Sequence, residues 1–75
     1  MKDLIEYIAS SLVSNPDAVQ VTEMTEGNRT VFRLQVAPED KGKVIGRQGR
    51  VAQAMRTVLR VAAVKDGSQA ILEIE

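Results

Sequence analysis

The sequence of 75 residues contains no cysteine, no histidine and no tryptophan. Without cysteine the chain can form neither a disulfide nor a thiolate metal site, and nothing in it indicates an oxidising compartment. Without histidine it lacks the commonest metal ligand and the imidazole base that serine and cysteine nucleophiles need. The remaining catalytic candidates are carboxylates such as Asp17, Glu23 and Glu26, which show no sign of convergence. The sequence therefore argues against an enzyme and against a bound metal or cofactor.

Long apolar runs are also absent. The longest, Val61 to Val64, is far shorter than the roughly 20 residues that a membrane-spanning helix needs. The N-terminus, MKDLIEYIASS, has acidic side chains among its apolar ones and lacks the layout of a signal peptide. We therefore expect a cytoplasmic protein that does not contact a membrane.

Size and charge give two further constraints. A chain of this length is expected to form one domain, residues 1–75, which buries only about 60% of the surface that its unfolded chain exposes. The formal net charge is zero, but residues 41–65 hold seven basic and no acidic side chains. Residues 1–40 hold three basic and seven acidic side chains, and residues 66–75 hold three acidic ones. Such segregation can present a positive surface to an anion, although a solvated helix face would have the same composition.

The pattern of apolar residues predicts six main elements. A helix is expected over about residues 3–13, opened by a capping box of Asp3 and Glu6. Two alternating, β-branched stretches, Val19 to Met24 and Thr30 to Val36, predict a hairpin with Phe32 facing the core. Pro38 begins a short helix, a longer helix follows, and the last strand is alternating. These later elements are expected at about residues 38–45, 50–64 and 70–75.

The predicted order is therefore α-β-β-α-α-β, with no internal repeat and no linker. Three short strands need helices on one face to enclose a core, so the fold class is α+β, a three-stranded sheet covered by three helices.

The stretch GKVIGRQGR, residues 42–50, joins the last two helices and holds three of the five glycines. A chain reversal through G-x-x-G leaves backbone amides pointing outward, and the second helix adds the positive end of its dipole. Glycine lets a phosphodiester approach the backbone closely. Arg47 and Gln48, the two variable positions, can both donate hydrogen bonds to phosphate or sugar. The turn therefore indicates a site for a phosphate backbone.

Two other glycine motifs do not fit the stretch, and a purely structural role is the remaining alternative. The stretch is not a Walker P-loop, because Gly46 is followed by Arg47 and Gln48 rather than by Lys and Ser or Thr. It is not a dinucleotide fingerprint, because Val44 occupies the position of an expected glycine. A bare G-x-x-G often only caps one helix and starts the next. The basic flanks, the preceding Val44-Ile45 pair and the order of the elements favour the phosphate-binding interpretation.

The residues Val44 to Arg50, followed by the helix Val51 to Val64, resemble the signature of a KH domain, and the order of elements is similar to the type II, bacterial form. The resemblance covers the whole chain and is closest to the KhpA family of small bacterial RNA-binding proteins. KH domains clamp about four nucleotides of a single strand through the GXXG loop. The resemblance implies binding of cellular RNA, a role as an RNA chaperone, a partner of the KhpB (Jag or EloR) type, and a link to cell elongation and cell-wall homeostasis.

In this interpretation the turn and its neighbours contact single-stranded RNA. Gly46 and Gly49 allow close approach, while Val44 and Ile45 line a groove. The polar contacts and the electrostatic attraction come from Arg47, Gln48, Lys41, Lys43 and Arg50.

The helix after the turn is apolar over a wider arc than one packed face requires. Its polar residues form one narrow stripe, and the rest are apolar. Small residues at the edges of the buried face would explain this. Alternatively, a second apolar flank of Ala54, Val58 and Val61 packs on a second copy, giving a homodimer, or on a partner protein. A protein-interaction module that binds RNA only secondarily is therefore the alternative function.

Overall fold

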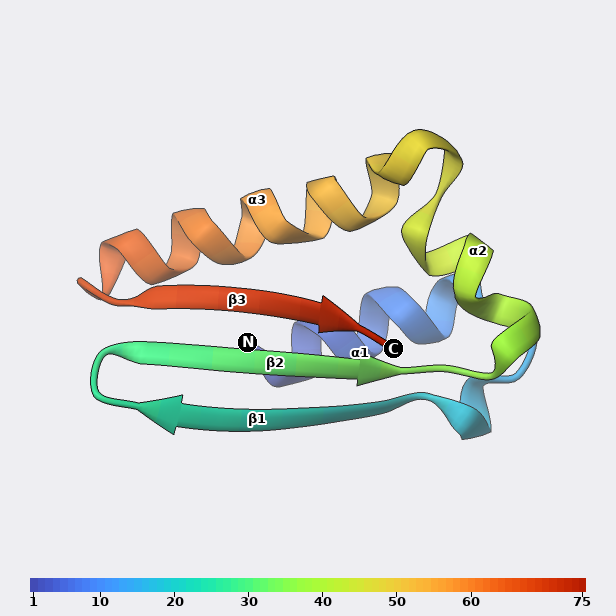
Figure 1. Cartoon of the computed structure of the whole chain (residues 1–75), viewed down its shortest axis with the longest axis horizontal. Coiled ribbons are helices and arrows are strands. Elements are labelled where there is room, and N and C mark those ends of the chain that lie inside the picture. Colours follow the sequence, from blue (N-terminus) through green and yellow to red (C-terminus); the bar gives the residue numbers. More distant parts are fainter.

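The computed structural model describes residues 1–75 and contains three helices and three strands (Figure 1). In chain order they are α1 (Lys2–Leu12), β1 (Gln20–Glu26), β2 (Arg29–Gln35), α2 (Lys41–Ile45), α3 (Arg50–Lys65) and β3 (Gln69–Ile74). Short 3₁₀ turns lie at Pro16–Ala18, Pro38–Asp40 and Arg47–Gly49. The predicted α-β-β-α-α-β order is confirmed, and most predicted boundaries are within two residues of those observed.

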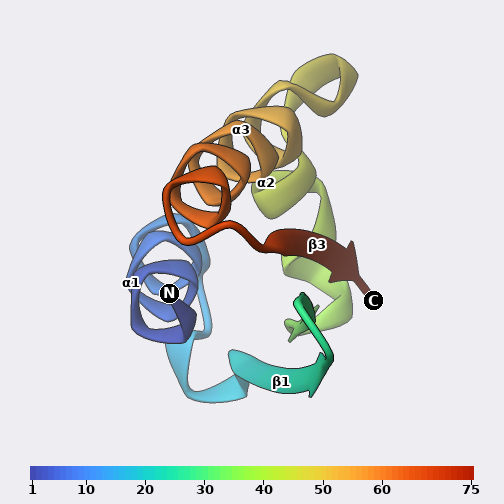
Figure 2. The same cartoon turned by 90° about the vertical axis from the view of Figure 1, so that its left-hand side faces the viewer.

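The strands form one mixed sheet in the order β1-β2-β3. The hairpin strands β1 and β2 are antiparallel, with Glu26 opposite Arg29 across a two-residue turn, whereas β2 and β3 are parallel. Helices α1 and α3 lie on one side of the sheet, where α1 packs along β1 and α3 along β3 (Figure 2). The predicted two-layer α+β fold is therefore confirmed.

One hydrophobic core lies between the two layers. The alternation of β2 directs Phe32 and Leu34 into the core, where both side chains are fully buried. Residues from all the other elements, including Ile5, Leu59 and Leu72, complete the cluster. The two aromatic residues have opposite environments, since Tyr7 on α1 is 73% exposed. The prediction that Phe32 belongs to the core is confirmed.

The start of α1 differs from the prediction. The helix begins at Lys2 with Met1 at the N-cap position, and no side chain caps it. Asp3 therefore lies within the first turn, so the proposed capping box of Asp3 and Glu6 is wrong. A carboxylate in the first turn still interacts favourably with the helix dipole, and this effect alone produces the same sequence pattern.

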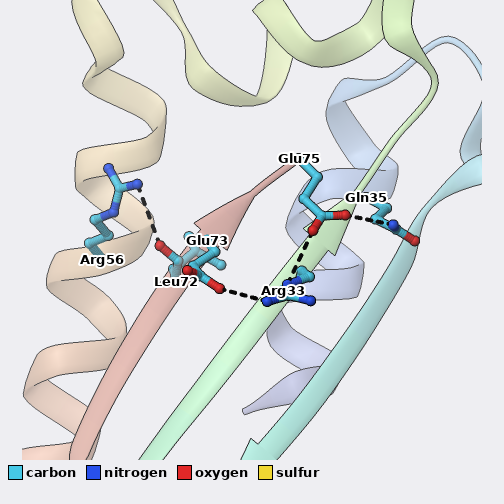
Figure 3. Close-up of polar contacts among 6 residues, drawn as sticks. All are labelled: Arg33, Gln35, Arg56, Leu72, Glu73 and Glu75. Carbon is cyan, nitrogen blue, oxygen red and sulfur yellow. Dashed lines mark hydrogen bonds and ion pairs between the residues drawn. The ribbon is translucent and has the colours of Figure 1, made fainter.

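On the outer, helix-free face of the sheet, charged side chains pair across the strands. Arg33 of β2 lies between the carboxylates of Glu73 (3.3 Å) and Glu75 (3.2 Å), and Gln35 donates to Glu75 (2.7 Å; Figure 3). These pairs are about half exposed, so each contributes at most about 1 kcal/mol to stability. Their main consequence is that the cation of Arg33 is already neutralised.

No helix in the structure combines the length and apolar character needed to cross a bilayer.

A buried carboxylate fixes the position of α2. Asp40, immediately before this helix, has no exposed surface, and its two carboxylate oxygens accept hydrogen bonds from the amides of Ser14 and Asn15, both at 3.1 Å. The Lys43 ammonium lies 3.5 Å from the same carboxylate. These contacts join the connection after α1 to the beginning of α2. They hold the pKa of Asp40 below its ordinary value, chiefly through the Ser14 amide and with help from Asn15 and Lys43, against the opposing effect of burial.

We predict that Asp40 makes the stability of the protein sensitive to acid. Because its pKa is lower in the folded than in the unfolded chain, its contribution is complete above the ordinary pKa of 3.8 and is lost as pH falls through the folded-state value. Asp40→Asn should therefore lower the melting temperature at neutral pH and lose less stability below about pH 4 than the native chain does. Thermal melts followed by circular dichroism between pH 2 and 7 (roughly the range in which carboxyl groups titrate) measure both effects.

The neighbouring exposed acid provides the control. Glu39→Gln removes one negative charge at an exposed position in the same turn and should leave both the melting temperature and its pH profile close to those of the native chain. Parallel pH profiles for the native chain and Asp40→Asn would contradict the role given to Asp40.

Candidate nucleic-acid interface

The glycine turn is a sharp reversal between α2 and α3, and it projects from one end of the molecule (Figure 1). Helix α2 ends at Ile45 because Gly46 adopts φ 79° and ψ 171°, which no helix contains. A 3₁₀ turn, Arg47–Gly49, follows, with Gln48 at φ 57° and Gly49 at φ 73°. Helix α3 then begins at Arg50. Four residues are thus sufficient to redirect the chain.

The two glycines of the turn have different physical roles. A Cβ on Gly46 would lie 2.5 Å from Cγ2 of Val51 and 2.9 Å from its backbone nitrogen, so the close packing of α3 on the turn requires glycine there. A Cβ on Gly49 would meet no atom within 4 Å, and this position needs glycine only for its left-handed φ. Open space therefore lies beside Gly49, on the side where a ligand could approach.

The turn has backbone amides that remain free. The amides of Gly46 and Gly49 donate to the carbonyls of Gly42 (2.9 Å) and Gly46 (3.1 Å), and that of Arg50 donates to Arg47. The amides of Arg47 and Gln48 donate to no acceptor in the turns and caps, and Gly46 before them belongs to no helical turn, so no helical hydrogen bond uses them. Both residues are exposed. Two consecutive free donors at the positive end of a long helix are suited to an anion such as a phosphodiester.

The side chains of the turn add positive charge and hydrogen-bond donors. Arg47, Gln48 and Arg50 are all exposed, and the Arg50 guanidinium donates to the Gln48 side-chain oxygen at 3.2 Å. This contact orients the Gln48 amide so that its NH₂ group remains available. Of the seven cations in residues 41–65, Lys43 alone has an acidic partner within 4.0 Å. The positive charge around the turn is therefore largely unneutralised within the chain.

The two lysines of α2 lie on different sides of the helix. Lys43 contacts Asp40 and the hydroxyl of Ser14, so its ammonium is held beside the connection that follows α1. Lys41 lines a shallow depression at the end of the sheet, together with Gln35 and Glu75 among others. Because α2 ends at Ile45, Lys43 and Arg47 do not lie on one continuous helix. The lysines therefore flank the turn without converging on it.

The apolar pair before the turn is divided between core and surface. Val44 is fully buried and belongs to the hydrophobic core, so the expectation that it lines a groove is wrong. Ile45 is 39% exposed and can offer an apolar contact. Consecutive residues on a helix point about 100° apart, which explains why burial of one exposes the other.

Arg56 of α3 is a further basic residue, which the sequence did not single out. From α3 it reaches the outer edge of β3 and donates to the carbonyl of Leu72 at 3.4 Å (Figure 3). No sequence signal indicated this contact, because the sequence does not specify which strand α3 covers.

No group of three or more acidic side chains comes together in a way that could hold a metal ion.

The surface hollows do not coincide with the turn. One of about 180 Å³ lies on the helix-free face of the sheet, where Met24, Val31 and Ile71 form a row across the three strands. A single strand laid along the surface does not require an enclosed pocket, whereas a small-molecule ligand usually does. The turn is thus better suited to a polymer backbone than to a small molecule.

The predicted partner surface on α3 is exposed as expected. Val58 is 46% exposed and Val61 is 54% exposed, and Ala54 is exposed one turn before Val58. The opposite face of the helix is buried through Ala52, Met55, Leu59 and Ala63. The apolar flank therefore lies outside the packing of this chain.

Comparison with known proteins gives the same assignment along almost the whole chain. Residues 2–74 match the model of the KhpA/KhpB KH domain family. The RNA-binding protein KhpA of Clostridium acetobutylicum is 55% identical over 74 residues, which cover 99% of each chain. The KhpA of Aquifex aeolicus is 49% identical (99% of this chain, 94% of the relative), and that of Treponema pallidum is 44% identical (97% and 91%). No solved structure matches the chain.

These relatives carry the name of an RNA-binding protein and not of an enzyme, which confirms the prediction that the chain is not an enzyme. The matched region includes the glycine turn, both flanking helices and all three strands. The chain therefore belongs to the KhpA/KhpB KH domain family.

Proposed function

We propose that this protein binds single-stranded RNA, with the turn Gly46–Gly49 gripping the sugar-phosphate backbone. The pair of free amides at Arg47 and Gln48 is the observation that carries the proposal. Anions bind such preoriented donors because no internal hydrogen bond has to be broken. The names of the relatives support RNA as the ligand, since each is called an RNA-binding protein.

The proposed contacts with RNA are of two kinds, those that position the strand and those that attract it. The amides and the side chains of Arg47 and Gln48 would hold one or two phosphates, and Ile45 and Gly49 would allow a nucleotide to lie close to the turn. Lys41, Lys43 and Arg50 would add attraction that does not depend on sequence. With no exposed aromatic side chain near the turn, base stacking would contribute little. A site of this kind binds weakly and tolerates many sequences.

We also propose that the exposed flank of α3 mediates assembly, as a homodimer or with a KhpB-type partner. Two clamps on one particle would raise the affinity for a long RNA through effective concentration. In this proposal the protein acts in the cytoplasm as an RNA chaperone linked to cell elongation and cell-wall homeostasis. If RNA binding is secondary, the same flank makes the protein an interaction module, which is the alternative supported by the exposure of Val58 and Val61.

The RNA proposal predicts that Arg47→Asp combined with Gln48→Asp abolishes binding without unfolding the domain. Both side chains are exposed, so the fold should persist, whereas two carboxylates beside the free amides would repel phosphate. Fluorescence anisotropy with a short labelled RNA, repeated at several salt concentrations, measures the affinity. For the native chain, log K should fall with log salt by about 0.7 per neutralised phosphate.

A double variant with the same change in charge tests whether position matters. Asn28→Asp with Arg29→Asp alters the charge equally, but at the hairpin between β1 and β2, at the end of the molecule opposite the turn (Figure 1). This variant should retain most of the RNA affinity. Equal losses in the two double variants would show that net charge, and not the turn, determines binding.

The two glycines of the turn should respond differently to substitution. Gly46→Ala should destabilise the domain by about 2–4 kcal/mol, because its Cβ would overlap Val51 and its φ is strained. Gly49→Asn should cost less than about 1 kcal/mol, because asparagine tolerates left-handed φ and the space is open. It should nevertheless weaken RNA binding severalfold, since the added side chain stands where the strand approaches. Thermal melts and anisotropy separate the two effects.

Gly67 offers a matched control for Gly49. It has a similar φ of 69°, also has open space around its missing Cβ, and lies beyond the other end of α3. Gly67→Asn should have a comparable effect on stability and no effect on RNA binding. If Gly49→Asn bound RNA as tightly as Gly67→Asn, the close approach at Gly49 would be disproved.

The assembly proposal predicts that Val61→Asp converts a dimer to a monomer. Val61 is 54% exposed, so a carboxylate there is compatible with the folded monomer but not with an apolar interface. Sedimentation velocity at micromolar concentration measures the change, and capture of a KhpB-type protein is measured in parallel. Met24→Asp, at a 63% exposed position on the helix-free face, is the control and should change neither result. A native chain that is strictly monomeric, together with unchanged partner capture by Val61→Asp, would disprove the role of this flank.

A further inference from the structure

The sheet has two outer edges, and only one of them is covered. The outer edge of β3 lies beside α3, from which Arg56 donates to the Leu72 carbonyl. The other edge belongs to β1, the strand farthest from α3 (Figure 2). All seven residues of β1 are exposed except Val21, and no backbone hydrogen bond outside the sheet involves them. An open edge of this kind is a template on which another strand can pair.

The register of the sheet identifies the free backbone groups of β1. The Leu34 carbonyl accepts a hydrogen bond from the Glu75 amide, so Leu34 directs its backbone groups toward β3 and not toward β1. Leu34 is paired with Val21, and hydrogen-bonded pairs alternate with non-bonded pairs along antiparallel strands. Val21, Glu23 and Thr25 therefore direct their amides and carbonyls away from the sheet.

The half of β1 near the hairpin is also open on both faces. Residues two apart in a strand share a face, so Glu23 and Thr25 lie on the same side as the buried Val21, the side that the helices cover. Both are nevertheless exposed, so no helix covers this part of the strand. An extended segment could thus lie along the edge without displacing any part of the chain.

The charges of β1 indicate what kind of segment fits. Glu23 and Glu26 are its only charged residues, and neither has a basic partner within 4.0 Å, although Arg29 is paired with Glu26 in the register. A second copy paired on this edge would bring four carboxylates together, and a phosphate backbone would be repelled. Lysine or arginine side chains on an added strand would instead form cross-strand pairs with these acids.

We propose that the free edge of β1 binds an extended, basic segment of a partner protein as a fourth strand of the sheet. The main-chain hydrogen bonds of Glu23 and Thr25 supply the pairing, and the two glutamates select the charge of the partner. This site is separate from the glycine turn and from the exposed flank of α3. The acidic half of the sequence therefore has a binding role of its own, independent of RNA.

The probe for this site is a synthetic peptide of alternating lysine and valine, seven residues long like β1. Its counterpart carries glutamate in place of lysine. Amide hydrogen exchange followed by NMR on the full chain measures pairing at single residues. The lysine peptide should slow exchange at the amides of Glu23 and Thr25 by about tenfold or more, whereas the glutamate peptide should leave it unchanged.

Two variants of the edge separate strand pairing from charge. Thr25→Pro removes an amide that faces solvent, so the fold should persist while the affinity for the lysine peptide falls about tenfold or more. Glu23→Gln with Glu26→Gln should lower this affinity about fivefold, because two cross-strand charge pairs are lost. The control, Glu39→Gln with Asp66→Asn, removes the same charge outside the sheet and should retain the native affinity.

Equal binding of the two peptides, or binding of the lysine peptide without slower exchange at Glu23 and Thr25, would overturn the inference. The same holds if no binding occurs at millimolar peptide. Slow exchange at these amides in the peptide-free chain that becomes fast on dilution would show that a second copy occupies the edge, and would also overturn it. If Thr25→Pro fails to fold, the exchange measurement on the native chain still decides. The Arg47→Asp, Gln48→Asp double variant should bind the peptide as the native chain does, so this result does not depend on the proposed RNA binding.

Discussion

The contact between the backbone of Gly46 and the side chain of Val51 determines the shape of the functional end of the molecule. Because Gly46 has no Cβ, the beginning of α3 can pack against the turn at a distance that no other residue would allow. Val51 is in turn packed against the core, and Val44, seven residues earlier on the other side of the glycine turn, is fully buried there. The packing of these two valines against the core thus fixes the angle between α2 and α3. The free amides of Arg47 and Gln48 are a consequence of that angle, because the chain reverses too sharply for helical hydrogen bonds to reach them.

A second fixed point holds the other end of α2. The carboxylate of Asp40 accepts two backbone hydrogen bonds from the connection after α1, and Lys43 compensates its charge. Burying an ionised group is costly unless its oxygens find such partners, and here both do. A helix of five residues would be unstable alone, yet this one is held at both ends by tertiary contacts. The turn is therefore preorganised, which reduces the conformational entropy that a ligand would have to overcome.

Local patterns predicted the elements well, because their signals act within a few residues. These signals are the alternation along β2 and the residues that begin or end helices, Pro38, Gly46 and Gly67. The direction of individual side chains was less predictable. In the sequence Asp40 is one of two consecutive acids at the start of the short helix, and only the position of α1 shows that its carboxylate is buried and hydrogen-bonded. Val44 and Ile45 are equivalent in the sequence, and the packing of α2 against α3 decides which is buried. The sequence likewise did not separate the steric need at Gly46 from the conformational need at Gly49.

The distribution of charge explains how a neutral protein can present a site for a polyanion. On the sheet, Arg33 is neutralised by two glutamates, whereas the cations after residue 40 have no acidic partner except Lys43. With a net charge of zero, the positive surface acts only within about one Debye length, roughly 8 Å at physiological salt. Such a protein gains little from long-range steering, so in the proposed function it would hold RNA by contact at the turn itself. Because one turn reaches few phosphates, a useful affinity for long RNA requires more than one turn on the same particle. In the proposed function the free amides at the turn would hold the RNA, and the exposed flank of α3 would join two such turns in one particle, so both features would serve the same requirement.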